Sequence, residues 1–220
     1  MDGRDCGMSQ RLSVSRVLLS VVAGCAITLP ALIAAPGDEI DRVRFPDVSP
    51  QDMTWEPNTE TYYVTTFIGG EILQLSPDFS FILSELTSPF DANEFLTGIA
   101  YDCINDTFWI AQPQLREIAE IYRPNPESEN PNIQNGGPTG RRIQPDFLPV
   151  VNPASQPAPR GMAFDHNGDG GTGTLWIVES LGTVIYEVNL DGEIMRSFVH
   201  PDDPDCLLYT SPSPRDGLLS

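Results

Sequence analysis

One sequence unit occurs three times between residues 53 and 201, and this repeat constrains the fold more than any other feature. Each copy opens with an apolar-aromatic-acidic stretch, at Met53–Glu56, Ile99–Asp102 and Met162–Asp165. Apolar triplets then follow at Tyr62–Val64, Phe108–Ile110 and Leu175–Ile177, and four-residue apolar stretches at Ile72–Leu75, Ile118–Ile121 and Ile185–Val188. The first two copies align without a gap at a step of 46 residues. We therefore expect one structural unit to be repeated along the chain.

Each copy is predicted to fold as short strands, because apolar runs of four to seven residues alternate with turn-forming residues and no helical period is present. The predicted strands are 53–55, 62–66, 71–75 and 81–86 in the first copy, 98–101, 107–111, 117–122 and, weakly, 143–150 in the second, and 161–164, 174–178, 184–189 and 193–199 in the third. A step of 40 to 50 residues with several short strands is typical of a propeller blade. The fold class is therefore all-β: a β-propeller of four-stranded blades.

The propeller is predicted to occupy residues 52–205, with blades near 52–90, 97–150 and 160–201. Tyr63, Trp109 and Trp176 hold the same place in the three copies and are expected to pack between blades. About three blades are too few to close a propeller, so we expect the chain to be truncated from one of six blades. Two sheet faces should then be left uncovered.

The N-terminal residues 1–35 read as a signal peptide. Arg11 and Arg16 precede an apolar run from Val17 that ends in the small residues Ala34 and Ala35, as in secretory signals. We expect a secreted protein, extracellular or periplasmic, with a polar lead-in at 36–51. Two alternatives remain: a membrane anchor, which Pro30 interrupts, and a bacterial lipoprotein signal that would attach a lipid to Cys25.

The C-terminal residues 206–220 are expected to be foreign to the protein. The stretch Cys206–Asp216 back-translates to a sequence that resembles, base for base, the transposase adapter used in short-read library preparation. A natural tail rich in proline and serine is the alternative. Cys103 is the only cysteine between 36 and 205, so that stretch is expected to hold no internal disulfide.

Charge and missing residue types exclude several classes of function. The formal net charge is −19, and all twelve basic residues are arginine, so nucleic acid and anionic membranes are unsuitable partners. Without lysine the chain has no P-loop and no Schiff base, and it lacks the G-x-S-x-G, H-E-x-x-H and C-x-x-C motifs. His166 and His200 are expected to lie at the surface. The remaining partners are a protein, a carbohydrate or a small molecule. The acidity fits either a saline habitat or the acidity that is common among secreted bacterial proteins.

Two insertions interrupt the repeat. Residues 124–159, rich in proline, asparagine and glycine, are expected to form a surface loop, either disordered or serving as a lid or partner-binding loop. The other insertion lies in the first hairpin of the third copy, where Asp165, Asn167 and Asp169 precede Gly170. This is the oxygen spacing of a calcium loop, although Trp176 stands where an EF-hand has its closing glutamate. A plain turn rich in Asp, Asn and Gly is the alternative.

The third copy, Gly161–Phe198, resembles the blade of NHL-type, gluconolactonase-like and streptogramin-lyase-like propellers, through its G-M-A-F-D, L-W-I-V, I-Y-E-V and D-G-E-I stretches. The first copy is similar to the opening blade of the gluconolactonase-like (SMP-30) group. That group is metal-dependent and has a Glu four residues before the tryptophan of this blade, where this chain has Gln51. Thr65 and Thr66 stand in place of the group's aspartate. The resemblance therefore implies the fold more strongly than the activity.

Together these patterns predict a secreted, NHL-like propeller that serves as a binding or scaffold module, with Ca²⁺ as its candidate cofactor. The alternative is a metal-dependent hydrolase of the gluconolactonase-like kind, or a streptogramin-lyase-like enzyme, whose active-site residues lie mostly in blades beyond the three predicted here. The sequence names no catalytic residue for either enzyme.

Overall fold

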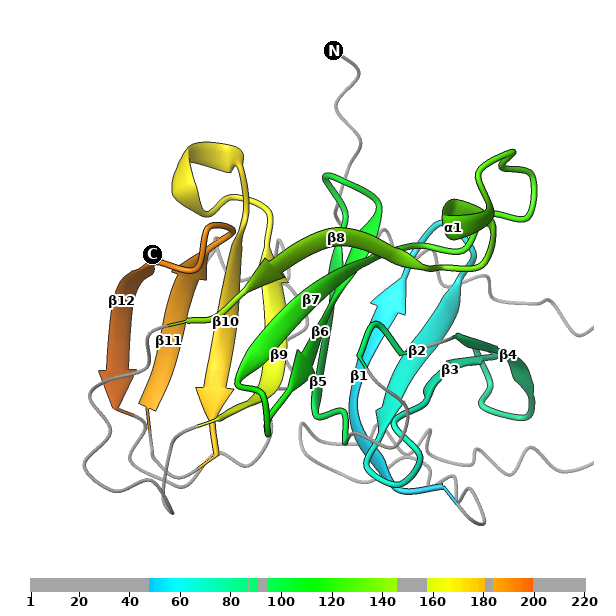
Figure 1. Cartoon of the computed structure of the whole chain (residues 1–220), viewed down its shortest axis with the longest axis horizontal. Coiled ribbons are helices and arrows are strands. Elements are labelled where there is room, and N and C mark those ends of the chain that lie inside the picture. Colours follow the sequence, from blue (N-terminus) through cyan, green and yellow to red (C-terminus); the bar gives the residue numbers. More distant parts are fainter. Residues whose placement is uncertain (1–47, 87, 91–94, 146–157, 181–183, 200–220) are drawn as a thin grey trace, which may run out of the picture.

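Three antiparallel sheets of four strands each make up the computed structural model of the chain, which describes residues 48–86, 88–90, 95–145, 158–180 and 184–199. In each sheet the strands follow one another in chain order (Figure 1). Their bounds in the first sheet are β1 Pro50–Glu56, β2 Thr61–Thr66, β3 Ile72–Leu75 and β4 Ile82–Leu86. The second has β5 Gly98–Asp102, β6 Thr107–Gln112, β7 Glu117–Tyr122 and β8 Pro138–Ile143, and the third has β9 Pro159–Asp165, β10 Thr174–Glu179, β11 Val184–Asn189 and β12 Ile194–Val199.

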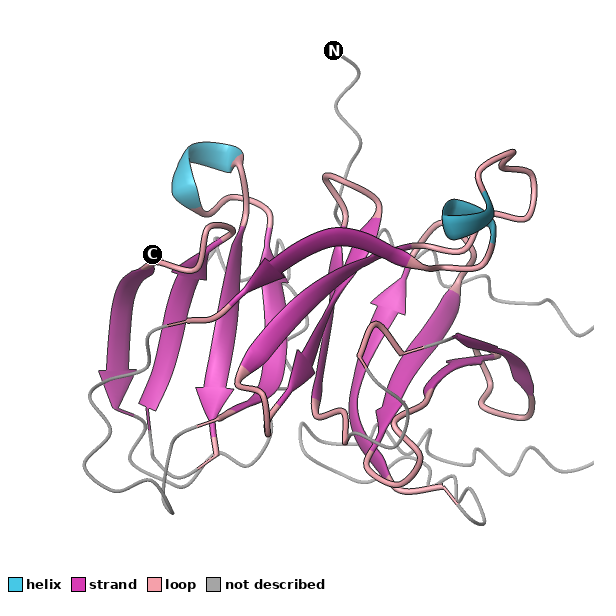
Figure 2. Ribbon diagram, in the orientation of Figure 1, coloured by secondary structure: helices cyan, strands magenta, loops and turns pink. Residues whose placement is uncertain are grey.

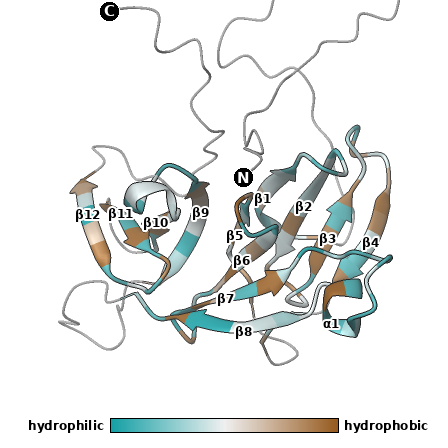
Figure 3. Ribbon diagram, turned by 90° about the horizontal axis from the view of Figure 1, so that it is seen from above, coloured by the Kyte–Doolittle hydropathy of each residue, from teal (hydrophilic) through white to brown (hydrophobic). Residues whose placement is uncertain are grey.

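The first strands of the three sheets, β1, β5 and β9, lie next to one another around a common centre. From them the sheets fan outward, so that β4, β8 and β12 lie at the periphery (Figure 3). Four-stranded sheets arranged radially around one centre are the blades of a propeller. The predicted all-β propeller fold, with about three blades, is therefore confirmed.

The sequence repeat is reproduced in the pairing of the strands. Tyr62 lies opposite Leu75, Phe108 opposite Ile121 and Leu175 opposite Val188, which are equivalent positions of the three copies. A side-chain hydrogen bond is repeated as well, since the first threonine of each second strand bonds Gln74, Glu120 or Glu187 on the neighbouring strand. The repeat thus fixes the register of each blade as well as its length.

Two apolar clusters join the sheets face to face. The first holds Tyr63 and Ile72 of the first sheet together with Phe108, Ile110 and Ile121 of the second. The second cluster holds Trp109 and Ile118 of the second sheet together with Met162, Leu175 and Ile177 of the third. Tyr63 and Trp109 are fully buried at these two junctions, as predicted for packing between blades. Trp176 is only half-buried.

The fourth strand of the middle sheet differs from the prediction. β8 begins at Pro138, five residues before the predicted start at Ile143, and falls within the predicted loop at 124–159. Its sequence, PTGRRI, has one buried residue, Ile143, and its other residues are exposed or half-buried. A peripheral strand needs little apolar surface, so the alternation that reveals buried strands is missing here.

The segment that leads into β8 packs back on the first sheet. It contains the four-residue helix α1 (Pro131–Gln134), whose N-cap residue Asn130 accepts a hydrogen bond from the N–H of Asn132 (Figure 2). Gly136 follows at φ +68°, and a Cβ there would lie 2.7 Å from Leu86 Cδ2. Beyond it, Arg142 donates to the carbonyl of Pro89 at 2.7 Å. This part of the insertion therefore contacts the core instead of projecting from it.

Several predicted features lie outside the described residues. These are the signal peptide at 1–35, the tail at 206–220, His200 and the loop residues 146–157. Within the described ranges, no helix is long and apolar enough to cross a membrane. Cys103 is disulfide-bonded. Because it is the only cysteine between residues 36 and 205, this bond does not contradict the prediction of no disulfide within that stretch.

Candidate functional site

Asp52 occupies the centre of the molecule, where the three inner strands meet. Its side chain extends from β1 and is buried, with 4% of its surface exposed. Oδ2 accepts hydrogen bonds from the backbone N–H of Ile99 on β5, at 3.1 Å, and of Met162 on β9, at 3.0 Å. Oδ1 accepts one from the N–H of Met53 at 2.9 Å. One carboxylate thus joins all three sheets.

Two opposing effects act on the pKa of Asp52. Burial disfavours the charged form and raises the pKa from 3.8 to about 7, while the hydrogen bonds from Met162, Ile99 and Met53 act to lower it. A carboxyl group that titrates near neutral pH has the range that suits a general base. The same carboxylate has three of its roughly four acceptor positions filled by N–H donors. About one acceptor position is left for a further donor or a cation.

At the two places where the gluconolactonase-like group carries acidic residues, the side chains of this chain form hydrogen bonds to backbone groups. Gln51 donates through Nε2 to the carbonyl of Pro50 at 3.2 Å. Thr65 donates to the carbonyl of Asp52 at 3.4 Å, and Thr66 accepts the N–H of Glu71 at 3.0 Å. None of the three side chains is a carboxylate, so these positions do not supply the charged ligands that the group's metal would need.

An acidic side chain ends each inner strand and caps the hairpin that follows it. Glu56 accepts the N–H groups of Asn58 and Thr59. Asp102 accepts those of Ile104 and Asn105, at 2.9 and 3.0 Å, and Asp165 accepts that of Asn167 at 2.9 Å. Side-chain oxygens that satisfy turn N–H groups in this way are a recurring hairpin feature. The acidic residue at the end of each inner strand is therefore explained by its hydrogen bonds to the turn that follows.

A second polar cluster lies at the ends of the first two sheets. Arg123, which follows β7, donates to both carboxylate oxygens of Asp106, at 2.6 and 2.9 Å. Tyr101 donates to Asp106 at 2.7 Å and accepts from Asn58 of the first sheet at 2.8 Å. The guanidinium–carboxylate pair raises the pKa of Arg123, and burial, followed by the hydrogen bond to Asp106, raises that of Tyr101. The cluster is a polar link between two blades.

The predicted calcium loop forms a compact turn between β9 and β10. A single 3₁₀ turn, Asp169–Gly171, lies at its tip, and Asp169 accepts the hydroxyl of Thr172 at 3.1 Å. A Cβ on Gly168 would lie 2.1 Å from Thr174 Oγ1, so close packing also explains a glycine there. Asp165 and Asp169 each accept hydrogen bonds from other residues of this loop, which agrees with a plain turn. In the described part of the chain, no three acidic, histidine or cysteine side chains gather around a common point, and calcium at Asp165, Asn167 and Asp169 stays a prediction.

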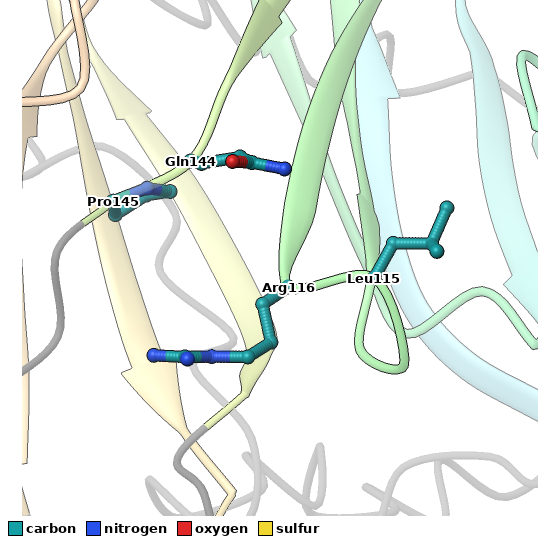
Figure 4. Close-up of a pocket in the computed structure, with 4 residues that line it drawn as sticks. All are labelled: Leu115, Arg116, Gln144 and Pro145. Carbon is teal, nitrogen blue, oxygen red and sulfur yellow. The ribbon is translucent and has the colours of Figure 1, made fainter. Parts of the chain in front are cut away.

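A small open pocket lies at the periphery of the middle sheet. It is lined by Leu115 and Arg116 of the β6–β7 turn and by Gln144 and Pro145, which follow β8 (Figure 4). In the close-up Leu115 points away from the other three side chains. Its lining includes no acidic, histidine or cysteine side chain that would mark a reaction centre.

No protein-family model matches the chain, and no curated protein matches it. Solved structures do match. Regucalcin, a calcium-binding protein of Agrobacterium tumefaciens, has a TM-score of 0.48 at 13% identity, over 70% of this chain and 46% of that one. A gluconolactonase of Xanthomonas campestris has a TM-score of 0.46 at 17% identity, over 73% of this chain and 51% of that one.

Hydrazine synthase of Kuenenia stuttgartiensis also matches, with a TM-score of 0.46 at 13% identity, over 77% of this chain and 41% of that one. The chain thus spans about half the length or less of the structures it resembles. Likeness at these identities and scores says nothing about activity. The propeller fold rests on the three repeated sheets themselves, with β1, β5 and β9 arranged around one centre.

Proposed function

We propose that this chain belongs to a secreted propeller that serves as a binding or scaffold module and not as an enzyme. The observation that carries this proposal is the hydrogen bonding of Asp52. A central carboxylate that accepts N–H groups from Met53, Ile99 and Met162 holds the blades together, so a structural role accounts for it without a catalytic one. Its partner is a protein, a carbohydrate or a small molecule, since the acidic chain disfavours nucleic acid.

Secretion rests on the predicted signal peptide at 1–35. Attachment of a lipid to Cys25 is the alternative form of the same proposal, and it would keep the protein at the membrane surface. Either form places the propeller outside the cytoplasm, where loops on a rigid scaffold serve as binding surfaces. Calcium bound at Asp165, Asn167 and Asp169 would order one of these loops.

A second candidate is a metal-dependent hydrolase of the gluconolactonase-like kind, with the rest of its active site in further blades. One observation favours it: burial raises the pKa of Asp52 to about 7, and such a group at a propeller centre can accept a proton near neutral pH. The two candidates differ in the role of Asp52. In the scaffold its oxygens accept hydrogen bonds from neighbouring strands, and in the hydrolase its carboxylate accepts a proton.

The two are distinguished by assaying the whole propeller, with any further blades, and its Asp52→Asn variant for hydrolysis of sugar lactones, with Ca²⁺, Mn²⁺ or Zn²⁺ added. The scaffold proposal predicts no metal-dependent turnover from either protein and a lower melting temperature for the variant. Turnover by the unaltered chain that the variant loses, while its near-ultraviolet circular dichroism is unchanged, would establish the hydrolase instead. Asp191→Asn, in an exposed turn, is the matched control.

A further inference from the structure

The sequence repeat assigns one common position to Asp52, Gly98 and Gly161. Each of them directly precedes the apolar residue that opens its copy, and the first two are separated by the 46-residue step. Two copies thus have no side chain at this position, and the first copy has a carboxylate. A Cβ on Gly98 would lie 2.2 Å from the carbonyl oxygen of Arg160, so the second copy has no room for a side chain there. The carboxylate of Asp52 is therefore a departure from the repeat.

The hydrogen-bond donors around this carboxylate are equivalent groups of the three copies. They are the backbone N–H groups of Met53, Ile99 and Met162, each of which directly follows the common position. All three belong to the first strand of a sheet, which pairs with the second strand along one edge and has its other edge toward the neighbouring first strands. Alternate N–H groups on such an edge have no partner within the sheet. The repeat therefore brings three N–H groups of one kind to one point.

A neighbouring side chain of β1 shows that these edge donors require an acceptor. Thr54, two residues after Asp52, accepts through Oγ1 the N–H of Tyr101 at 3.3 Å, and Tyr101 lies two residues after Ile99. Side chains of β1 thus replace a paired strand for the inner edge of β5. Thr54 fills this role with a neutral hydroxyl for one donor, whereas Asp52 accepts three donors from three sheets.

The place that the Asp52 carboxylate occupies has the properties of an anion site. Converging backbone N–H groups carry partial positive charge and form concavities that hold anions. The three donor distances, 2.9, 3.1 and 3.0 Å, are those of well-formed hydrogen bonds. No ion pair between described residues includes Asp52, so backbone donors and not a cation hold this carboxylate. Without it, three buried donors would lack an acceptor.

We propose that the first strands of the three sheets form a binding site for a small carboxylate, and that Asp52 occupies this site as a ligand supplied by the chain itself. Three N–H donors without a cation suit a compact monoanion such as formate. Further blades of the same repeat would bring further N–H groups of the same kind, so the inference also holds for a longer chain. It goes beyond the proposed function and does not depend on whether the propeller is a scaffold or a hydrolase.

Asp52→Gly in the whole propeller, with any further blades, tests this proposal. The substitution removes the built-in ligand and gives the first copy the residue of the other two. The variant should melt at a lower temperature than the unaltered chain, and sodium formate should raise its melting temperature in a saturable way, as a ligand of the folded state does. Trimethylacetate, which has the same charge and is too bulky for the site, should have no such effect.

Screening by salt and loss of charge are controlled separately. The unaltered chain is melted in the same salts, because screening acts on both proteins, and the effect assigned to the site is the additional rise in Asp52→Gly. Asp52→Asn keeps an amide oxygen in the site and should gain no more from formate than the unaltered chain does. Asp191→Gly, in an exposed turn, also exchanges an acid for glycine and should likewise gain no more.

Amide hydrogen exchange locates the bound formate. In Asp52→Gly the N–H groups of Ile99 and Met162 should exchange fast without formate and slowly with it, while amides in the middle of β6 and β10 change less. Asp52→Ala replaces Asp52→Gly if the glycine variant does not fold. If neither variant folds in plain buffer, refolding in formate should restore the near-ultraviolet circular dichroism of the unaltered chain.

A folded variant that formate stabilises no more than it stabilises the unaltered chain would overturn the proposal. An equal effect of trimethylacetate would also overturn it, because the site would then have no size limit. The same holds if formate leaves the exchange of Ile99 and Met162 unchanged, or if both variants stay unfolded in its presence.

Discussion

At the scale of single residues, Asp52 accepts hydrogen bonds from two strands that are distant along the chain, β5 and β9. Replacing it by alanine leaves the N–H groups of Ile99, Met162 and Met53 without their acceptor. A buried donor left without a partner costs about 1–3 kcal/mol, and partial relaxation is expected, so Asp52→Ala should lower the free energy of unfolding by about 3 kcal/mol. Urea denaturation measures this. Asp191→Ala is the control, and an equal effect of the two substitutions would contradict the role given to Asp52.

The pH dependence of stability also depends on Asp52. Its pKa in the folded chain is raised to about 7 from 3.8, so the folded state binds the proton more tightly than the unfolded state. Stability from this group is therefore complete below about pH 4 and is lost as the pH rises through about 7. Comparing denaturation of the unaltered chain with that of Asp52→Asn at pH 5 and pH 8 isolates the effect. The unaltered chain should lose more stability over this interval, and equal losses would refute the assignment.

At the scale of strands and turns, the spacing of β5 and β9 depends on Gly98. A Cβ at this position would lie 2.2 Å from the carbonyl oxygen of Arg160 and 2.8 Å from Met162 Cγ. Gly98→Ala must therefore push the two inner strands apart, and overpacking of this kind costs about 3 kcal/mol. Gly140→Ala is the comparison. A Cβ added there meets no atom within 4 Å, and only the φ of +95° disfavours the alanine. Thermal melts in which the two variants are equally stable would contradict the close approach of the sheets.

The β9–β10 turn carries the calcium prediction. If Asp165, Asn167 and Asp169 bind one Ca²⁺, calorimetry should show binding at millimolar concentration or tighter, and Asp169→Ala should abolish it because one of three oxygen ligands is lost. Asp191→Ala removes an acid from another exposed turn and should leave the heat unchanged. Binding that survives Asp169→Ala, or no heat at all, would leave this segment as a plain turn.

These elements also show why some features were predictable from the sequence and others were not. Strands such as β6 and β10 are buried along most of their length, so their apolar runs predicted them at nearly the observed bounds. β8 has a single buried residue, and its polar sequence was therefore read as loop. No role for Asp52 could be predicted from the sequence, because its partners Ile99 and Met162 are 47 and 110 residues away along the chain. No local pattern reports contacts of that range.

At the scale of the whole molecule, stability also depends on electrostatic repulsion among the acidic residues, which the individual hydrogen bonds and packing contacts do not include. The chain has a net charge of −19 and no lysine, so like charges repel one another more strongly in the compact state than in the unfolded state. Added salt screens this repulsion, and at 1 M the screening length is about 3 Å. The melting temperature should therefore rise between dilute buffer and about 1 M NaCl. A flat or falling trend would count against repulsion as a limit on stability and against the saline habitat.

The central claim is that one carboxylate ties three blades together at the centre of the propeller. Amide hydrogen exchange of Ile99 and Met162 tests it most directly, because these two N–H groups bond Asp52 across sheets. In the unaltered chain both amides should exchange as slowly as those in the middle of β6 and β10, and in Asp52→Ala they should exchange selectively faster. Fast exchange of Ile99 and Met162 in the unaltered chain, or exchange that Asp52→Ala leaves unchanged, would contradict the claim.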